Sequence, residues 1–346
     1  MQVSCENCLK SYDLPDDRLP KGKLVAFPCP ACKSKIMLDL RQNDEREDDS
    51  RLVFKPLSDE KENILDIDDL KKRIIRKVDD LPPMPKVMIK AREIMADPNS
   101  SFKEIAQVIE TDQAIAARVL KIANSAYYGL SGMVSSIHQA TVVLGYKTLE
   151  QVITMVSSSS MLGRQLKGYQ LNAGVLWKHS LATALASRLI AQKRAPALES
   201  DAFSVGLIHD AGKLALDPYV GAKKKEIEAY IKDHSASFVQ AERQVLGFDH
   251  TEIAHDLCKK WKLPESQAAA MRYHHTPAES GENQLAYIVY MANHIAGLAG
   301  CGCGLKGEED ILDMADLNML RLKNDDIEKM AGEVSSAVAE ITASLG

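Results

Sequence analysis

FKEIAQVIETDQAIAARVLKIAN, residues 102–124, carries the spacing that decides the fold. Its apolar side chains recur at intervals of three and four residues, at Ile105, Val108, Ile109, Ile115, Val119 and Ile122. An α-helix completes a turn in about 3.6 residues, so these side chains share one face that can be buried. The segment therefore predicts amphipathic helix packed against other helices.

The same rhythm continues on both sides of this segment. PKVMIKAREIMA (85–96) is amphipathic and is followed by DPNSS (97–101), which offers helix breakers and a cap. ATVVLGYKTLEQVITMV (140–156) and ILDIDDLKKRIIRKV (64–78) are also helical, and LPPMP (81–85) is a stiff bend before the next helix. Because no run in this body shows strand alternation, the sequence predicts an all-α domain over 64–300, with its core at 81–276, and a C-terminal helical extension over 301–346.

Composition is that of an ordinary globular protein. Of the 346 residues, 45% are hydrophobic and 26% charged, and the net charge of −5 gives no overall basic surplus for nucleic acid. The N-terminus lacks a signal-peptide pattern, and the most apolar long stretch (287–300) is interrupted by Asn293 and His294 and is too short to span a bilayer. We therefore expect a cytoplasmic protein, in which clustered cysteines more often bind metal than form disulfides.

Four cysteines near the N-terminus have the spacing of a zinc site. Two Cys-x2-Cys pairs lie twenty residues apart, formed by Cys5, Cys8, Cys29 and Cys32. Four thiolates close a tetrahedral sphere, so the zinc would be structural, whereas a redox dithiol would need a surrounding βαβ pattern that is absent. Charge in residues 1–40 is nearly balanced, which favours a protein contact or a structural role over DNA binding. Residues 41–63 begin with the charge-dense RQNDEREDDSR and are interpreted as a linker.

Two resemblances accompany these patterns. CENCLKSYDLPDDRLPKGKLVAFPCPACKSKI resembles the zinc-ribbon module at the N-terminus of many bacterial regulatory and envelope proteins. The segments LPPMPKVMIKAREIM, FKEIAQVIETDQAIAARVLKIANSAYYG and SSIHQATVVLGYKTLEQVI resemble the HDOD domain, a bacterial signalling domain related to the HD metal-dependent phosphohydrolases. The second resemblance implies a multi-helix bundle whose second half is built like an HD hydrolase. It also implies a regulatory or scaffolding role without catalysis.

The HD resemblance implies a set of metal ligands. VGLIHDAGKLAL (205–216) contains the His209–Asp210 pair, two residues about 100° apart on a helix, and both could reach one ion. Asp210 needs a partner in so apolar a run, and Lys213 either pairs with it or contacts a phosphate. Glycines at 206 and 212 allow close backbone packing. His179 matches the first ligand by position, although a histidine on a core-facing stripe is more often structural.

Three further histidines match the two-metal relatives by position, and each also has a purely structural interpretation. His250 could simply begin a helix. His274 and His275 could end the helix ESQAAAMRYHH, where the helix dipole favours histidine. Imidazole and carboxylate ligands together suit Fe, Mn or Zn.

Two departures weaken the hydrolase pattern. Asn293 stands where the superfamily has its last metal-binding aspartate, and a neutral amide is a weaker ligand. The GYP loop of the cyclic-di-GMP phosphodiesterases is absent after His275. GCGCG (300–304) is interpreted as a flexible loop. We therefore predict a non-catalytic signalling protein that binds a partner protein or ligand, with a metal-dependent phosphohydrolase as the alternative. The oligomeric state stays open.

Overall fold

The computed structural model describes residues 2–4, 11–13, 24–28, 35–39, 71, 74, 86–97, 100–303 and 319–345. The chain divides into two compact units, Met1–Asp59 and Glu60–Gly346. No helix in these described ranges has the length and apolar character needed to cross a bilayer.

The first unit contains two short antiparallel strand pairs. Strand β1 (Gln2–Ser4) pairs with β2 (Ser11–Asp13), and β3 (Leu24–Pro28) pairs with β4 (Lys35–Asp39). The four cysteines of the predicted zinc site and the predicted linker lie outside the described residues. The zinc ribbon therefore stays a prediction.

The described elements of the second unit are helices and helical turns, apart from one isolated bridge between Leu166 and Leu171, which confirms the all-α prediction. Its first part contains α2 (Lys86–Ala96), α3 (Phe102–Glu110), α4 (Gln113–Ala123) and α5 (Ile137–Leu162). The short 3-10 turn η3 (Ala126–Tyr128) lies between α4 and α5. The predicted cap before α3 is Ser101, which forms a capping box with Glu104. Ile74, from the segment 64–78, is fully buried in the same core.

The segment 102–124 forms two helices instead of one continuous repeat. The helix is interrupted at Thr111 and Asp112. Asp112 Oδ1 accepts hydrogen bonds from the backbone N–H groups of Ala114 and Ile115, at 3.0 Å each. Aspartate stabilises a helix start because its side chain satisfies N–H groups that have no partner within the helix. Helix α5 is also interrupted, at Gly145, whose φ of 72° and ψ of 169° are not helical.

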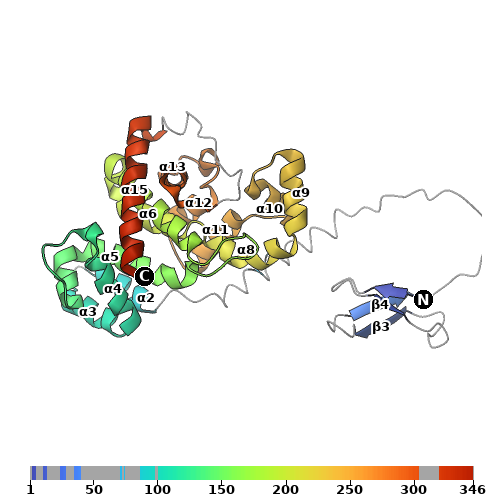
Figure 1. Ribbon diagram of the computed structural model, residues 1–346, viewed down its shortest axis with the longest axis horizontal. Helices are drawn as coiled ribbons and strands as arrows, with labels where there is room; N and C mark the ends of the chain where they lie inside the picture. The colour runs from blue at the N-terminus through green and yellow to red at the C-terminus, as the bar shows by residue number, and fades with distance from the viewer. Residues whose placement is uncertain are drawn as a thin grey trace, which may run out of the picture. The chain divides into compact units, whose positions relative to one another are not determined.

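The second part surrounds the long helix α6 (Val175–Arg194), which packs against α7 (Glu199–Ile208), α13 (Gln284–Ala296) and α15 (Asn324–Leu345). Helix α8 (Ala211–Ala222) packs on α11 (His250–Lys260), and α11 packs on α12 (Glu265–Arg272). Helices α9 (Lys224–His234) and α10 (Phe238–Leu246) lie at the end of the unit opposite α2–α5 (Figure 1). Short turns complete it: η4 (Pro196–Leu198), η5 (Pro277–Ser280) and the π-helical turn η6 (Gly297–Cys301).

Two glycines let these helices approach closely, as their positions in the sequence predicted. A Cβ atom at Gly206 would lie 2.9 Å from the Cα of Ala184 in α6. At Gly212 it would lie 1.9 Å from the carbonyl oxygen of His250, so α8 and α11 are in direct backbone contact. These two contacts place the segment between α7 and α8 against both α6 and α11.

Two predicted helix boundaries are wrong. His209 and Asp210 do not share one uninterrupted helix, because α7 ends at Ile208 and α8 begins at Ala211. The chain changes direction there, since α7 packs on α6 whereas α8 packs on α11. Helix α12 ends at Arg272, so His274 and His275 lie just beyond it. The residue before Pro277 disfavours helical backbone, which limits how far α12 can extend.

Candidate metal centre

The structure brings together all six side chains that the sequence singled out in the helical domain. His179 projects from α6, His209 and Asp210 from the junction of α7 and α8, and His250 from the first residue of α11. His274 and His275 follow α12. These residues form the histidine–aspartate cluster: His179, His209, Asp210, His250, His274 and His275.

Asp210 lies at the centre of the cluster and divides it into two groups. Its Oδ2 atom lies 3.6 Å from Nε2 of His179 and 3.5 Å from Nε2 of His209. Its Oδ1 atom lies 3.4 Å from Nε2 of His250 and 3.7 Å from Nε2 of His274. His275 joins the second group, with its Nε2 atom 3.3 Å from that of His250. Within each group the potential ligand atoms lie within 4.8 Å of one another.

Backbone carbonyls fix the orientation of three imidazole rings. Nδ1 of His179 contacts the carbonyl oxygen of Cys301 at 3.0 Å, Nδ1 of His209 that of Gly206 at 2.8 Å, and Nδ1 of His274 that of Met271 at 2.8 Å. A carbonyl oxygen only accepts, so each Nδ1 carries a proton and each neutral ring presents an Nε2 lone pair to the cluster. Metal-binding histidines are commonly oriented in this way.

His250 is oriented by a carboxylate instead. Glu242, a fully buried residue of α10, accepts hydrogen bonds from Nδ1 of His250 at 2.7 Å and from its backbone N–H at 3.1 Å. The hydroxyl of Tyr169 donates to the other oxygen of Glu242. Asp249 caps the start of α11 by accepting from the N–H groups of Thr251 and Glu252, at 2.9 and 3.0 Å, which holds His250 at the helix terminus.

The pKa of His250 is shifted in the opposite direction from those of His179, His209 and His274. Burial lowers the pKa of His179 and His274, and it lowers that of His209 to about 3, so these rings stay neutral. For His250, burial also opposes charge, but the adjacent Glu242 outweighs it and raises the pKa to about 10. Burial opposes the charge of Asp210 as well, yet Lys213 and the neighbouring histidines hold its pKa well below the usual range.

The cluster is almost closed to solvent. His209, His250 and His274 are 0% exposed, Asp210 is 1% exposed, and His179 and Lys213 are 4% exposed. Only His275 is partly exposed among the six. Lys213 Nζ lies 2.9 Å from Oδ2 of Asp210, so its ammonium pairs with the carboxylate. Within the described part of the chain, Nε2 of His274 is buried without a hydrogen-bond partner, and Oδ1 of Asp210 has Nε2 of His250 at 3.4 Å.

Asn293 is half-buried in α13, and among the described residues its side chain makes no hydrogen bond to any of the six. The loop predicted at residues 300–304 is helical at its start, because Gly300 and Cys301 belong to a π-helical turn, whereas Gly302 and Cys303 have no regular secondary structure. Cys301 ends a π-helical turn with its carbonyl on His179, and the buried Cys303 has its Sγ atom 3.6 Å from Oδ2 of Asp210.

Sequence reasoning missed Glu242 and Cys303. Glu242 had a signal, because it is a charged residue on the buried face that α10 forms with Phe238, Ala241 and Leu246. Cys303 had no comparable signal, since its contact with Asp210 joins residues 93 positions apart.

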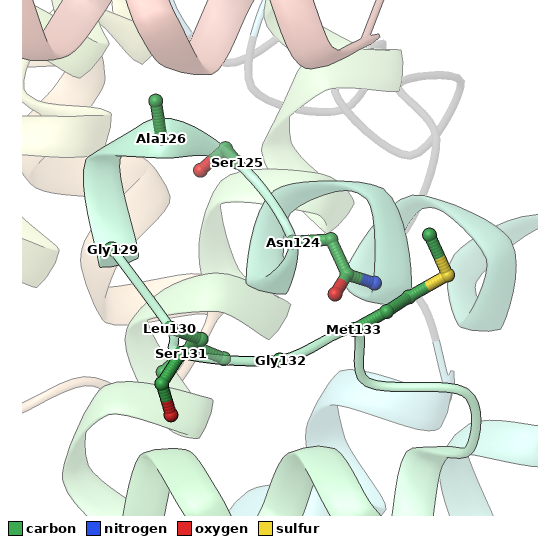
Figure 2. A pocket seen from close by; sticks show the side chains of 8 residues that line it. All are labelled: Asn124, Ser125, Ala126, Gly129, Leu130, Ser131, Gly132 and Met133. Carbon is green, nitrogen blue, oxygen red and sulfur yellow. The ribbon is translucent and has the colours of Figure 1, made fainter.

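A surface pocket has a lining separate from the cluster. It has a volume of about 340 Å³ and is lined by the chain between α4 and α5 (Figure 2). Asn124 closes this loop, since its Nδ2 atom donates to the carbonyl oxygen of Val134 at 2.9 Å and its Oδ1 atom accepts from the Val134 N–H at 2.8 Å. None of the six cluster residues lines this cavity.

Comparison with known proteins places these observations in a family. The model of the HDOD domain matches residues 81–277. A crystal structure of an HDOD domain protein of unknown function from Geobacter sulfurreducens superposes with a TM-score of 0.62 and 24% identity, covering 80% of this chain and 97% of the other. A protein from Shewanella amazonensis, provisionally named a phosphohydrolase, superposes with a TM-score of 0.58 and 23% identity, covering 79% and 98%. Such identities show a shared fold.

One curated relative is an uncharacterized protein of Treponema pallidum. It is 26% identical over 208 residues, which are 58% of this chain. The match spans only 39% of the relative's own length.

Proposed function

Because this chain belongs to the HDOD domain family, we propose that it is a regulatory signalling protein. Its histidine–aspartate cluster holds a metal ion as a structural element and does not turn over substrate. The observation that carries this proposal is a set of inward-facing imidazole lone pairs around one carboxylate that solvent barely reaches.

The lone pairs support a bound cation. Nε2 of His179 lies 3.3 Å from Nε2 of His209, and the carbonyls on their Nδ1 atoms leave both facing nitrogens without a proton. Two lone pairs repel at this distance unless a cation lies between them. Nε2 of His274 adds a buried atom with no hydrogen-bond partner among the described residues, which costs free energy unless a ligand satisfies it. The residues therefore fit a divalent metal ion, for which Fe, Mn and Zn are the candidates.

The burial of the cluster supports a structural role for that ion. Metal-dependent hydrolysis needs an open coordination position for water and a path for the phosphate ester. Here the shared carboxylate is 1% exposed and already pairs with the buried ammonium of Lys213. Asn293, at the position of the superfamily's last aspartate, contributes no charge to the site. An ion held by His179, His209 and Asp210 would join α6 to the junction of α7 and α8.

The signalling role implies contact with another protein. Three large apolar side chains are exposed on the loop before α5 and on the first part of that helix: Met133 is 84% exposed, Val142 54% and Val143 48%. The predicted structural zinc at Cys5, Cys8, Cys29 and Cys32 would add a small protein-contact module. Nucleic acid is a poor partner for a chain with a net charge of −5.

A second candidate function is metal-dependent phosphohydrolysis. Asp210 belongs to both ligand groups, so its two oxygens could bridge two ions. His275, the partly exposed member of the second group, would lie on the side from which a substrate could enter.

One experiment separates the two candidates. In the full chain, Cys5, Cys8, Cys29 and Cys32 are replaced with serine, so that any remaining metal belongs to the helical domain; we call this the ribbon-free background. Metal content is measured by elemental analysis, and generic phosphoesters are assayed with added Mn or Fe. The variants are Asp210→Ala and, as a matched control, His255→Ala, a half-buried α11 histidine that is not in either ligand group.

We expect bound metal in the background protein and in His255→Ala, its loss in Asp210→Ala, and no turnover in any of them. Phosphoester turnover that disappears in Asp210→Ala would refute the structural role and favour the hydrolase. A background protein without metal would refute the metal centre itself.

A further inference from the structure

The loop between α4 and α5 leaves part of its main chain without hydrogen bonds. Its two ends are fixed, because Asn124 holds Val134 and the N–H of Gly129 donates to the carbonyl oxygen of Ala126 at 3.0 Å. Between these points, the backbone N–H and C=O groups of residues 130–133 form no hydrogen bond with any described part of the chain. These residues are half-buried or exposed, so their main-chain groups can pair with a ligand.

The same loop is also held by packing. Leu130, near its middle, packs against a small buried apolar cluster of Ala123, Val134 and Ala140. Hydrogen bonds at the two ends and this contact between them give the loop one conformation before any ligand binds. A loop that is already ordered loses little conformational entropy on binding, which increases affinity.

A buried hydroxyl group in the lining of the pocket lacks a partner. Ser125 is 7% exposed, and its Oγ atom makes no hydrogen bond to any residue that the structure describes (Figure 2). Three other buried serine hydroxyls without partners belong to the helices α5 and α6 and do not line this pocket: Ser157, Ser180 and Ser187. A buried polar group without a partner costs free energy, and at Ser125 a ligand in the pocket could satisfy it.

The lining favours an uncharged ligand that offers both donors and acceptors. None of the eight described lining residues is ionisable, so a phosphate group would find N–H donors but no cation, and the carbonyl groups would stay unused. A peptide main chain alternates N–H and C=O groups, as residues 130–133 do, and can pair with both.

The side chains of the lining also suit a peptide. Gly129 and Gly132 have no side chain that would keep a second backbone at a distance. Met133 is 84% exposed, and its flexible thioether can adapt to different apolar side chains of a bound peptide. The volume of about 340 Å³ lies at the lower end of the range for ligand pockets, which suits a short segment.

We propose that the loop 124–133 binds a short, uncharged peptide segment of another protein, which pairs its main chain with residues 130–133 and forms a hydrogen bond with the hydroxyl of Ser125. The inference rests on the proposed signalling function and names the surface and the kind of partner that this function uses. The test of the proposed function measures metal content and phosphoester turnover, whereas the test below measures peptide binding. Either can therefore fail without the other.

The probe is a phage-displayed library of random seven-residue peptides, selected on the immobilised full chain. Recovered peptides are synthesised with a fluorescent label, and their Kd is measured by fluorescence polarisation. Ser125→Ala removes only the hydroxyl, and its matched control is Ser187→Ala, which removes another buried hydroxyl without a partner. Because neither hydroxyl forms a hydrogen bond within the described residues, the urea midpoint of each variant should be no lower than that of the parent.

A second pair of variants blocks the loop with a side chain. A Cβ atom at Gly132 or at Gly332, in α15, would meet no atom within 4 Å, and neither residue has a positive φ. Both Gly132→Leu and its matched control Gly332→Leu should therefore fold, and only the first adds a side chain to the lining of the pocket.

We expect peptides that bind the parent and both controls equally, with affinity about five- to tenfold weaker in Ser125→Ala and at least about tenfold weaker in Gly132→Leu. Methylation of single backbone nitrogens of such a peptide removes one donor at a time, and at one or more positions it should weaken binding by about tenfold.

Four results would overturn the proposal. They are a library that yields no binding peptide, binding that Gly132→Leu leaves unchanged, binding that is insensitive to backbone methylation at every position, and displacement of the peptide by inorganic phosphate, which would instead indicate an anion site. None of these results bears on the metal centre.

Discussion

Replacing Gly212 with alanine should disconnect α8 from α11 and so open the histidine–aspartate cluster. The added Cβ would lie 1.9 Å from the carbonyl oxygen of His250 and 2.9 Å from the backbone nitrogen of Ala254. Real Cβ atoms essentially never approach within 3.0 Å, so the first contact must lengthen by at least 1.1 Å, the difference between 3.0 and 1.9 Å. Both obstacles are backbone atoms, so no side chain can rotate away to relieve them.

This displacement exceeds what a metal site tolerates, because ligand distances in such sites vary by only about 0.2 Å. We expect the free energy of unfolding to fall by about 3 kcal/mol, the upper end for overpacked cores. Bound metal should fall with it, since Gly212 lies two residues after Asp210, the ligand shared by both groups, and the carbonyl that moves belongs to His250. Urea denaturation gives the first quantity and elemental analysis of the native protein gives the second.

Gly221→Ala is the matched control on the same helix. Its Cβ would meet nothing nearer than the Cα of Gly168, at 3.5 Å, so we expect unchanged metal content and a gain of about 0.5–1 kcal/mol from helix propensity. Equal stability of the two variants would refute the close approach of α8 and α11. A destabilised Gly212→Ala protein that keeps its metal would refute the dependence of the cluster on that contact.

Three further predictions follow from individual contacts. Burial lowers the pKa of His209 to about 3, against about 6.5 in the unfolded chain, so its contribution to stability is present above pH 6.5 and is lost as the pH falls towards 3, at up to about 1.4 kcal/mol per pH unit. The free energy of unfolding should therefore differ less between pH 7 and pH 4.5 in His209→Asn than in the parent. An equal pH difference in the two proteins would contradict this prediction. Asp249→Ala should lower the free energy of unfolding by about 2 kcal/mol in thermal denaturation, because it removes a buried helix cap and two hydrogen bonds from Arg243. Ser101→Ala, which removes an exposed cap, should lower it by only about 1 kcal/mol. The reverse order would count against the proposed positioning of α11. In the ribbon-free background, removal of metal by a chelator should lower the free energy of unfolding by about 2.7 kcal/mol, if the free metal concentration before removal was about a hundred times the Kd. An unchanged urea midpoint would argue against a structural ion.

The helical framework could be predicted because its information is local. Apolar residues at three- and four-residue intervals identify the buried faces of α3 and α4, and Ser101 identifies the start of α3. The same local pattern could not locate the break at Asp112, since the apolar spacing continues across it. Capping by a single aspartate side chain outweighed the continuity of the stripe.

The ligand set could be predicted only as far as residue type allows. Histidine and aspartate within apolar helices pointed to six positions that the fold brings together. Cys303 depended on how the turn after α13 packs onto the cluster, which no spacing along the chain encodes. Glu242 could be singled out only as a charged residue on the buried face of α10, without its partner. For the same reason the sequence could not show that Lys213 lies on Asp210, although it offered that pairing as one of two possibilities.

The anchoring of the histidine rings determines where mutations can adjust the cluster. Three rings are oriented by main-chain oxygens, those of Gly206, Met271 and Cys301, and every amino acid that could replace these residues carries the same oxygen. A fourth buried ring, that of His250, takes its direction from a side chain, that of Glu242. Single substitutions that leave the backbone in place can therefore redirect one ring and must leave the other three as they are. Residue 242 is therefore a position at which a single side-chain change can alter the orientation of a buried ring in the cluster.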